Sequence, residues 1–210
     1  HALEGNDDGT GFDIDIDAIN CIVQYNYSHD NEGGFMLFVD ASNSNGSIVR
    51  YNVSQNDKTR IFMIAGGVTP NTQIYNNTIY IKEGLSTNII EHTWDDGGDI
   101  DAPWTFKNNL IYNYGTGGFK IPGKGGILIN NMYFTKQSQA ELPDPFKIIK
   151  DPQLMNPGSG TMGLKSLDGY KLKKNSPAYK AGAVIDHNGG KDFFGNQVDV
   201  YSKPNIGVVN

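Results

Sequence analysis

Acidic and apolar residues alternate along residues 12–17, which read Phe-Asp-Ile-Asp-Ile-Asp. Such alternation is typical of a β-strand with its carboxylates on one face. The acids expected to share that outer face are Asp13, Asp15 and Asp17. Carboxylates two residues apart on a strand lie about 6.6–7 Å apart, within the roughly 6.5–9.5 Å that separates the catalytic carboxyl groups of inverting glycoside hydrolases. Because neighbouring like charges drive pKa values apart, this row is a candidate for general acid–base catalysis.

A fourth acid, on the next lap, is expected to extend this row. Asp40 follows an apolar stretch and comes 23 residues after Asp17, so a coiled chain would stack the two carboxylates about 5 Å apart, the spacing of retaining glycosidases. Two other interpretations stay open. Asp7, Asp8 and Asp13 together offer the hard oxygen ligands that calcium prefers. The acids can equally form a solvated surface that binds no ion.

Residues 28–32 form a second polar cluster, with the sequence Ser-His-Asp-Asn-Glu. His29 is its candidate general acid or base, because an imidazole titrates near neutral pH. The alternative is a turn in which His29 only makes local hydrogen bonds.

A third cluster occupies residues 91–104, where an insertion is longer than a turn needs. Long loops often carry function, and Glu91, His92, Trp94 and Asp95 are candidates for sugar binding. Trp94 offers a ring face for stacking, and the acids can accept hydrogen bonds from sugar hydroxyls. The alternative is that Trp94 and Trp104 pack the loop onto the body of the protein.

The elements that position these residues are predicted by a repeat of asparagines. Asn26, Asn52, Asn77, Asn109 and Asn131 follow one another at intervals of 26, 25, 32 and 22 residues. One polar residue held at one phase of such a repeat indicates a solenoid. In a coil of parallel strands these asparagines would stack and bond to one another and to turn backbone, each tolerating the left-handed conformation of the turn. The Asn-X-Ser/Thr sequences at two of them are therefore interpreted as scaffold rather than glycosylation sites.

The alternation of apolar residues predicts which side chains fill the coil. The expected core positions of the first two laps are Phe12, Ile14, Ile16, Phe35, Leu37 and Val39. Their neighbours would then point outward as an apolar patch made of Met36, Phe38, Phe62 and Ile64. A patch of that kind normally has a cover, and we expect the C-terminal segment to provide it.

Two stretches, residues 8–15 and 23–35, make the chain resemble right-handed parallel β-helix proteins of the pectate-lyase-like superfamily, a resemblance that covers residues 9–134. Residues 150–154, 175–178, 192–196 and 204–207 resemble the closing segment of many secreted β-helix proteins. The resemblance implies β-helix coils over residues 1–138 and an irregular closing segment over 139–210. It also implies secretion and work on polysaccharides, as a hydrolase, a lyase or a sugar-binding protein. Lyases of this fold use a basic residue, but Arg50, Lys58 and Arg60 match no lyase motif.

Composition excludes several other classes. The net charge of −6 gives no footprint for nucleic acid or an anionic membrane, and no apolar run reaches the roughly 18 residues of a membrane span. The single cysteine, Cys21, precludes an internal disulfide and is expected in the core. The chain begins at His1 and has no visible N-terminal cap, so we expect upstream coils of a longer precursor, or another chain, to pair with that edge.

The sequence thus predicts an all-β, right-handed parallel β-helix of about five coils with an irregular C-terminal closing segment. The predicted function is that of a secreted, carbohydrate-active protein, part of a polysaccharide-degrading glycoside hydrolase, with calcium as the one candidate cofactor. The alternatives are a non-catalytic module that binds polysaccharide or calcium, and a polysaccharide lyase.

Overall fold

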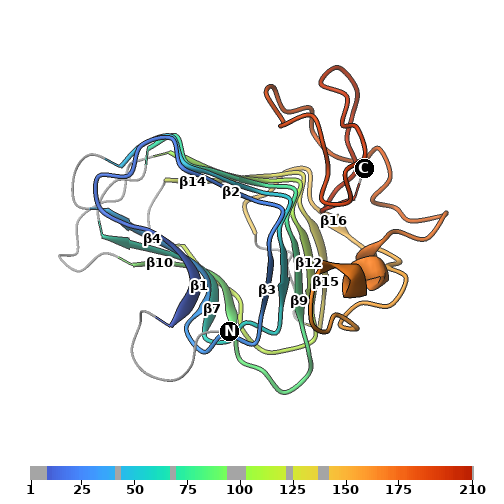
Figure 1. Ribbon diagram of the computed structural model, residues 1–210, viewed down its shortest axis with the longest axis horizontal. Helices are drawn as coiled ribbons and strands as arrows, with labels where there is room; N and C mark the ends of the chain where they lie inside the picture. The colour runs from blue at the N-terminus through green and yellow to red at the C-terminus, as the bar shows by residue number, and fades with distance from the viewer. Residues whose placement is uncertain are drawn as a thin grey trace.

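The computed structural model describes residues 9–40, 44–66, 70–93, 103–121, 125–136 and 142–209. It is an all-β parallel solenoid, as predicted, and it makes about four turns rather than five. Three parallel sheets form its sides, each named here after its first strand (Figure 1). The chain visits the three sheets in rotation, so strands adjacent in a sheet lie one lap apart in sequence.

The β1 sheet contains β1 (Thr10–Ile14), β4 (Gly34–Asp40), β7 (Arg60–Gly66), β10 (Asn88–Thr93) and β13 (Phe119–Lys120). The β2 sheet contains β2 (Ile22–Gln24), β5 (Ile48–Arg50), β8 (Gln73–Tyr75), β11 (Trp104–Lys107) and β14 (Gly126–Ile129). The β3 sheet contains β3 (Tyr27–His29), β6 (Val53–Gln55), β9 (Thr78–Ile81), β12 (Leu110–Asn113), β15 (Met132–Thr135) and β16 (Ile148–Ile149). The last strand, β16, lies in the segment that was expected to be irregular.

The register of the β1 sheet corrects the predicted core. Phe12 is level with Met36, which is level with Phe62, so the lap interval from β1 to β4 is one residue longer than assumed. As a result, the four residues predicted to form an outward apolar patch, Met36, Phe38, Phe62 and Ile64, are all buried in the central core. Edge-to-face aromatic pairs connect these laps, with Phe35 5.7 Å from Phe12 and 5.6 Å from Phe62 between ring centroids.

The same shift moves other residues out of the core. Ile16 lies in a turn after β1 and is 55 % exposed. Leu37 is level with the exposed Asp13, so it belongs to the outer face of the sheet, where it is nevertheless buried. Cys21 does pack against the central core, half-buried, as predicted.

The asparagine ladder is confirmed. Asn26 donates from its side-chain amide to Oδ1 of Asn52 at 3.1 Å, and Asn52 donates to Asn77 at 3.0 Å. The ladder continues through Asn109 to Asn131 with distances of 3.0 and 3.2 Å. One detail was wrong: the left-handed backbone belongs to the residue before each ladder position, which is Tyr25, Tyr51, Asn76, Asn108 and Asn130 in turn. The ladder amide stabilises that turn from the next position.

The C-terminal segment packs along the outside of the solenoid (Figure 1). Its apolar residues, including those of the short 3₁₀ helix η1 (Leu164–Tyr170), join the outer side chains of the β3 sheet in a second core. A smaller cluster covers part of the β2 sheet, where Ile185 and Val198 pack on Tyr51 and Tyr75. The segment was expected to cover the β1 sheet, and the structure overturns that prediction because the side chains concerned already fill the central core.

Candidate active site

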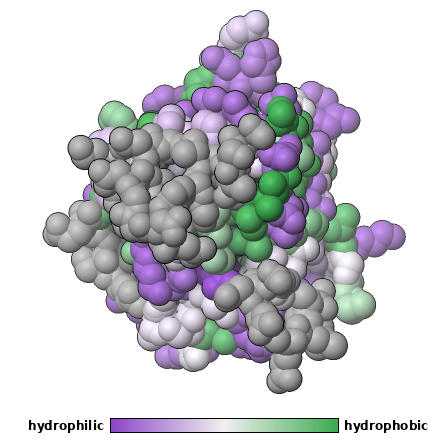
Figure 2. Space-filling view, turned by 90° about the vertical axis from the view of Figure 1, so that its left-hand side faces the viewer, coloured by the Kyte–Doolittle hydropathy of each residue, from purple (hydrophilic) through white to green (hydrophobic). Residues whose placement is uncertain are grey.

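The outer face of the β1 sheet is the side of the solenoid that the C-terminal segment does not cover (Figure 1). One outward column crosses all five strands and consists of Asp13, Leu37, Met63, Glu91 and Lys120. Viewed from the side opposite the C-terminal segment, the described surface carries hydrophilic residues with a band of hydrophobic ones among them (Figure 2). In the outward column of the β1 sheet, the ionisable groups of Asp13, Glu91 and Lys120 thus alternate with the apolar Leu37 and Met63.

The acidic row lies on the first strand of this sheet and is less regular than predicted. Strand β1 ends at Ile14, so only Asp13 lies within it. Asp15 follows directly and accepts the backbone N–H of Ile16 at 2.7 Å, and Asp17 takes a left-handed backbone with φ of 61°. All three acids are exposed. Since Asp13 and Asp15 are two residues apart where extended backbone ends, they remain the pair whose expected spacing suits an inverting mechanism.

The prediction that Asp17 stacks on Asp40 is wrong. Asp13 is level with Leu37 and Ile14 with Phe38, and continuing that register places Ile16, not Asp17, opposite Asp40. Asp40 ends β4 and is level with Gly66 on its other side. Asp17 and Asp40 are therefore not stacked at the spacing of a retaining glycosidase.

Glu91 and His92 lie side by side on β10 but face opposite ways. Glu91 points outward, where the ammonium group of Lys120 is 3.2 Å from its carboxylate and Asn88 donates a further hydrogen bond. Of the four predicted sugar ligands, Glu91 thus lies on the outer face of the β1 sheet, with its side chain 15 % exposed. Lys120 was not singled out in the sequence, although the lap interval of 29 residues between them was the signal that could have identified it.

His92 is a core residue, which contradicts its predicted role in sugar binding. It is only 2 % exposed, it is level with Ile64, and its Nδ1 accepts the indole N–H of Trp104 at 3.3 Å. Burial lowers the pKa of His92 to about 4, because the charged imidazolium would lose its hydration. Trp104 itself is fully buried in the central core as the first residue of β11, so it packs inside the coil rather than holding the loop against its outside.

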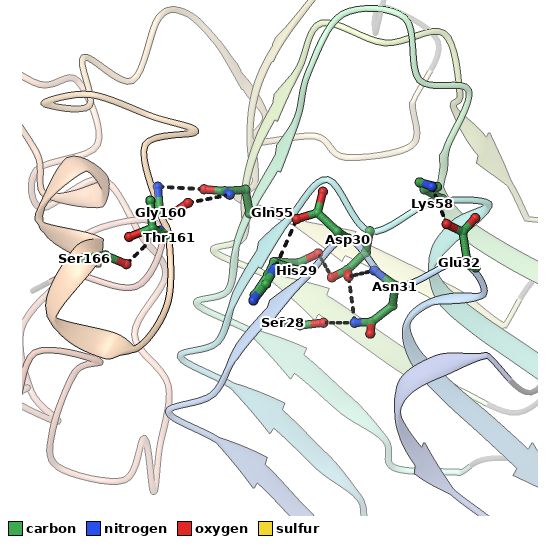
Figure 3. A network of polar contacts seen from close by, with 12 residues as sticks. Ser28, His29, Asp30, Asn31, Glu32, Gln55, Lys58, Gly160, Thr161 and Ser166 are labelled. Carbon is green, nitrogen blue, oxygen red and sulfur yellow. Dashed lines mark hydrogen bonds and ion pairs between the residues drawn. The ribbon is translucent and has the colours of Figure 1, made fainter. Parts of the chain in front are cut away.

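His29 lies apart from the acids, on the β3 sheet beside the C-terminal segment (Figure 3). Its Nδ1 is 3.0 Å from a carboxylate oxygen of Asp30, and its ring stacks on Tyr27 with centroids 4.8 Å apart. The neighbouring Glu32 pairs with Lys58 in the next lap. These are the local contacts of a structured turn, and they place His29 on a different sheet from Asp13.

The three candidate basic residues for lyase chemistry are buried or paired. The guanidinium of Arg50 donates to Gln24 and Tyr75 at 2.8 Å each and to the carbonyl of His187 in the C-terminal segment at 3.0 Å. Arg60 is 5 % exposed, and Lys58 forms the ion pair with Glu32. None of the three stands on the outer face of the β1 sheet as a free base.

The remaining candidates lie outside the described residues. These are Asp7 and Asp8 of the calcium prediction and Trp94 and Asp95 of the long loop. Within the part of the chain that the structure describes, no three His, Cys, Asp or Glu side chains are grouped to hold a metal ion. In the same part there is no helix with the length and apolar character to cross a bilayer.

Comparison with known proteins bears on the class of activity. No family model matches the chain. The chain is 27 % identical over 247 residues to Lacto-N-biosidase from Bifidobacterium longum subsp. longum. The match spans all of this chain but 14 % of that protein, so the chain corresponds to a small part of its relative. A distant relative of this β-helix is thus a glycosidase, while the likeness to the pectate-lyase-like superfamily rests on the sequence resemblance.

Proposed function

We propose that this β-helix is part of a secreted glycoside hydrolase and that its glycan lies along the outer face of the β1 sheet. The observation that carries the proposal is the exposed pair Asp13 and Asp15, one at the outer edge of the β1 sheet and the other directly after β1. A glycosidase among its distant relatives supports the reaction class. Lacto-N-biosides, which the name of that relative specifies, are the first substrates to examine.

The proposed mechanism is inverting hydrolysis. One carboxyl group protonates the glycosidic oxygen while the other, as a carboxylate, takes a proton from the attacking water, so the two need room for a water molecule between them. Asp13 and Asp15 are expected to lie about 7 Å apart, as residues i and i+2 of extended chain do. The half-buried Met63 lies between Leu37 and Glu91 in the same column and offers contact to the less polar faces of sugar rings, whereas Leu37 is buried.

The test is hydrolysis of an oligosaccharide panel that includes lacto-N-biosides, measured for the wild type, Asp13→Asn and Asp15→Asn. Removal of a general acid or base is expected to lower kcat by about 10²–10⁴-fold. Asp151→Asn is the matched control, because Asp151 is an exposed acid of the C-terminal segment that accepts one local hydrogen bond. Full activity in both Asp13→Asn and Asp15→Asn would refute the assignment of these two residues.

A non-catalytic glycan-binding module is the second candidate. It is favoured by the small share of the relative that the chain matches, because the catalytic groups of that protein can lie in the remainder. Glycan binding without hydrolysis, weakened by Glu91→Gln or Met63→Ala and unaffected by Asp15→Asn, would support the module. Calcium binding through Asp7, Asp8 and Asp13 stays part of this second proposal, and a melting temperature insensitive to a chelator would count against it.

A further inference from the structure

The two ends of the asparagine ladder differ in their hydrogen bonding. At the C-terminal end, Asn131 donates its backbone N–H and its side-chain amide to the Asp144 carboxylate, each at 2.9 Å. A carboxylate is an acceptor only, so it ends the series. Asp144 therefore acts as a terminator built into the chain.

The N-terminal end has no such terminator among the described residues. Each inner member follows one pattern: Oδ1 of Asn52 accepts two N–H groups of Asn26, and Nδ2 of Asn52 donates to the carbonyl of Val23 in the preceding lap. Asn77 repeats this with the carbonyl of Val49. In the described chain, Asn26 has neither a donor at its Oδ1 nor a carbonyl from a preceding lap.

Exposure at this end agrees with the open ladder. Asn26 is half-buried, whereas the ladder residue of the next lap, Asn52, is fully buried. Three isoleucines of the first lap are 51–61 % exposed, namely Ile16, Ile19 and Ile22. Strands β1, β2 and β3 are each the outermost strand of their sheet at this end, so three backbone edges are presented together.

We infer that this end binds one further β-helical lap, formed by a preceding part of the same polypeptide and carrying an asparagine level with Asn26. Such a lap would supply every partner that this end of the solenoid lacks. Its backbone N–H and side-chain amide would donate to Oδ1 of Asn26, a carbonyl would accept from Nδ2, and apolar side chains would cover the isoleucines.

A second copy of the chain fits less well. Two copies meeting end to end about a two-fold axis would place one Asn26 acceptor opposite the other. A head-to-tail copy would bring up the Asp144 end, where the ladder position again offers a carboxylate and no amide donor. The polarity of the ladder therefore selects a parallel lap with an asparagine.

The preceding lap is inferred independently of the proposed function, but it would add residues next to the proposed glycan site. Asp13 lies on β1, the outermost strand of the uncovered sheet. A preceding lap would add a strand about 4.8 Å from β1 and so place two or three more outward side chains beside the acidic pair. The glycan site would then be shared between this chain's first lap and the lap that precedes it.

The experiment adds a lap whose register is known. In the extended variant, a copy of residues 34–58 replaces residues 1–8, so that the copy runs into Gly9 as residue 58 runs into the start of β7. The copied Asn52 would then stand level with Asn26. Hydrogen exchange and thermal unfolding are measured with and without Asn26→Ala in both the natural and the extended chain.

We expect amide exchange in β2 and β3 to slow at least tenfold in the extended variant. We also expect Asn26→Ala to lower its melting temperature at least twice as much as it lowers that of the natural chain. Equal losses in both chains, or an added lap without exchange protection, would overturn the inference. Concentration-dependent dimerisation of the natural chain, abolished by Asn26→Ala, would instead identify a second copy as the occupant. Because none of these readouts is activity, failure here is distinct from failure of the proposed hydrolase.

Discussion

Asp144→Asn is predicted to destabilise the protein strongly, although it changes one atom of a side chain. Oδ1 of Asp144 accepts the backbone N–H groups of Asn130 and Phe146, at 2.9 and 3.1 Å. Oδ2 accepts the backbone and side-chain N–H groups of Asn131 at 2.9 Å each and the hydroxyl of Tyr133 at 3.4 Å. Whichever oxygen the substitution replaces with an NH2 group, that group then faces backbone or side-chain N–H groups, which cannot accept a hydrogen bond.

The cost follows from the bonds lost at the converted oxygen. Keeping Oδ2 as the carbonyl loses the two bonds of Oδ1 and weakens the others, since the remaining acceptor is neutral. Hydrogen bonds to charged groups contribute about 1.5–3 kcal/mol each and are not additive, so the expected loss is about 3 kcal/mol. For a domain of this size that corresponds to a fall in melting temperature of about 6–12 °C.

Thermal and urea unfolding, followed by circular dichroism, measure this loss. Asp57→Asn is the matched control, because Asp57 is as buried as Asp144. Its Oδ1 accepts from Asn31 at 2.8 Å, but its Oδ2 faces the Ser54 hydroxyl at 2.7 Å, which can reverse and accept from an amide. Burial also raises the pKa of Asp57, so a neutral replacement avoids a desolvated charge. Asp57→Asn is expected to be neutral or stabilising, and equal destabilisation by both variants would refute the reasoning.

Three further predictions concern the core and the turns. Asn77→Ala removes the acceptor of both Asn52 donors and should cost about 3 kcal/mol in urea unfolding; a loss under 1 kcal/mol would contradict a structural role for the ladder. The folded-state pKa of His92 is about 4, below its ordinary value, so the unfolded state binds the extra proton. The free energy of unfolding should therefore fall by about 3 kcal/mol as the pH drops from 6.5 to 4. His92→Phe should flatten that part of the stability profile, and an unchanged slope would exclude His92 as its cause. Gly34 has φ of +122°, and a Cβ there would lie 1.8 Å from the carbonyl oxygen of Arg60, so Gly34→Ala should lower the melting temperature sharply in a scanning measurement, whereas a well-folded variant would show that the turn relaxes.

The sequence alone determined the class of fold and the phase of its laps. Asn26, Asn52, Asn77, Asn109 and Asn131 recur at one position of the lap, and a buried amide that bonds to its own copies tolerates no other phase. The periodicity of these five residues was therefore sufficient to predict the parallel solenoid and its ladder. The Asp144 terminator was not predicted, because it lies after the repeat and is recognisable only by the atoms it accepts.

The tertiary structure decided the register between laps, and with it the faces. Turn lengths vary from lap to lap, so the sequence left the interval from β1 to β4 uncertain by one residue, and a one-residue shift exchanges the two faces of a strand. That shift moved Met36 and Phe38 into the core and separated Asp17 from Asp40. It also decided which sheet the C-terminal segment leaves open, since covering depends on apolar surface that only the assembled coil presents. Asp13 keeps its predicted outward place because it alternates with core residues within a single strand, where no turn intervenes.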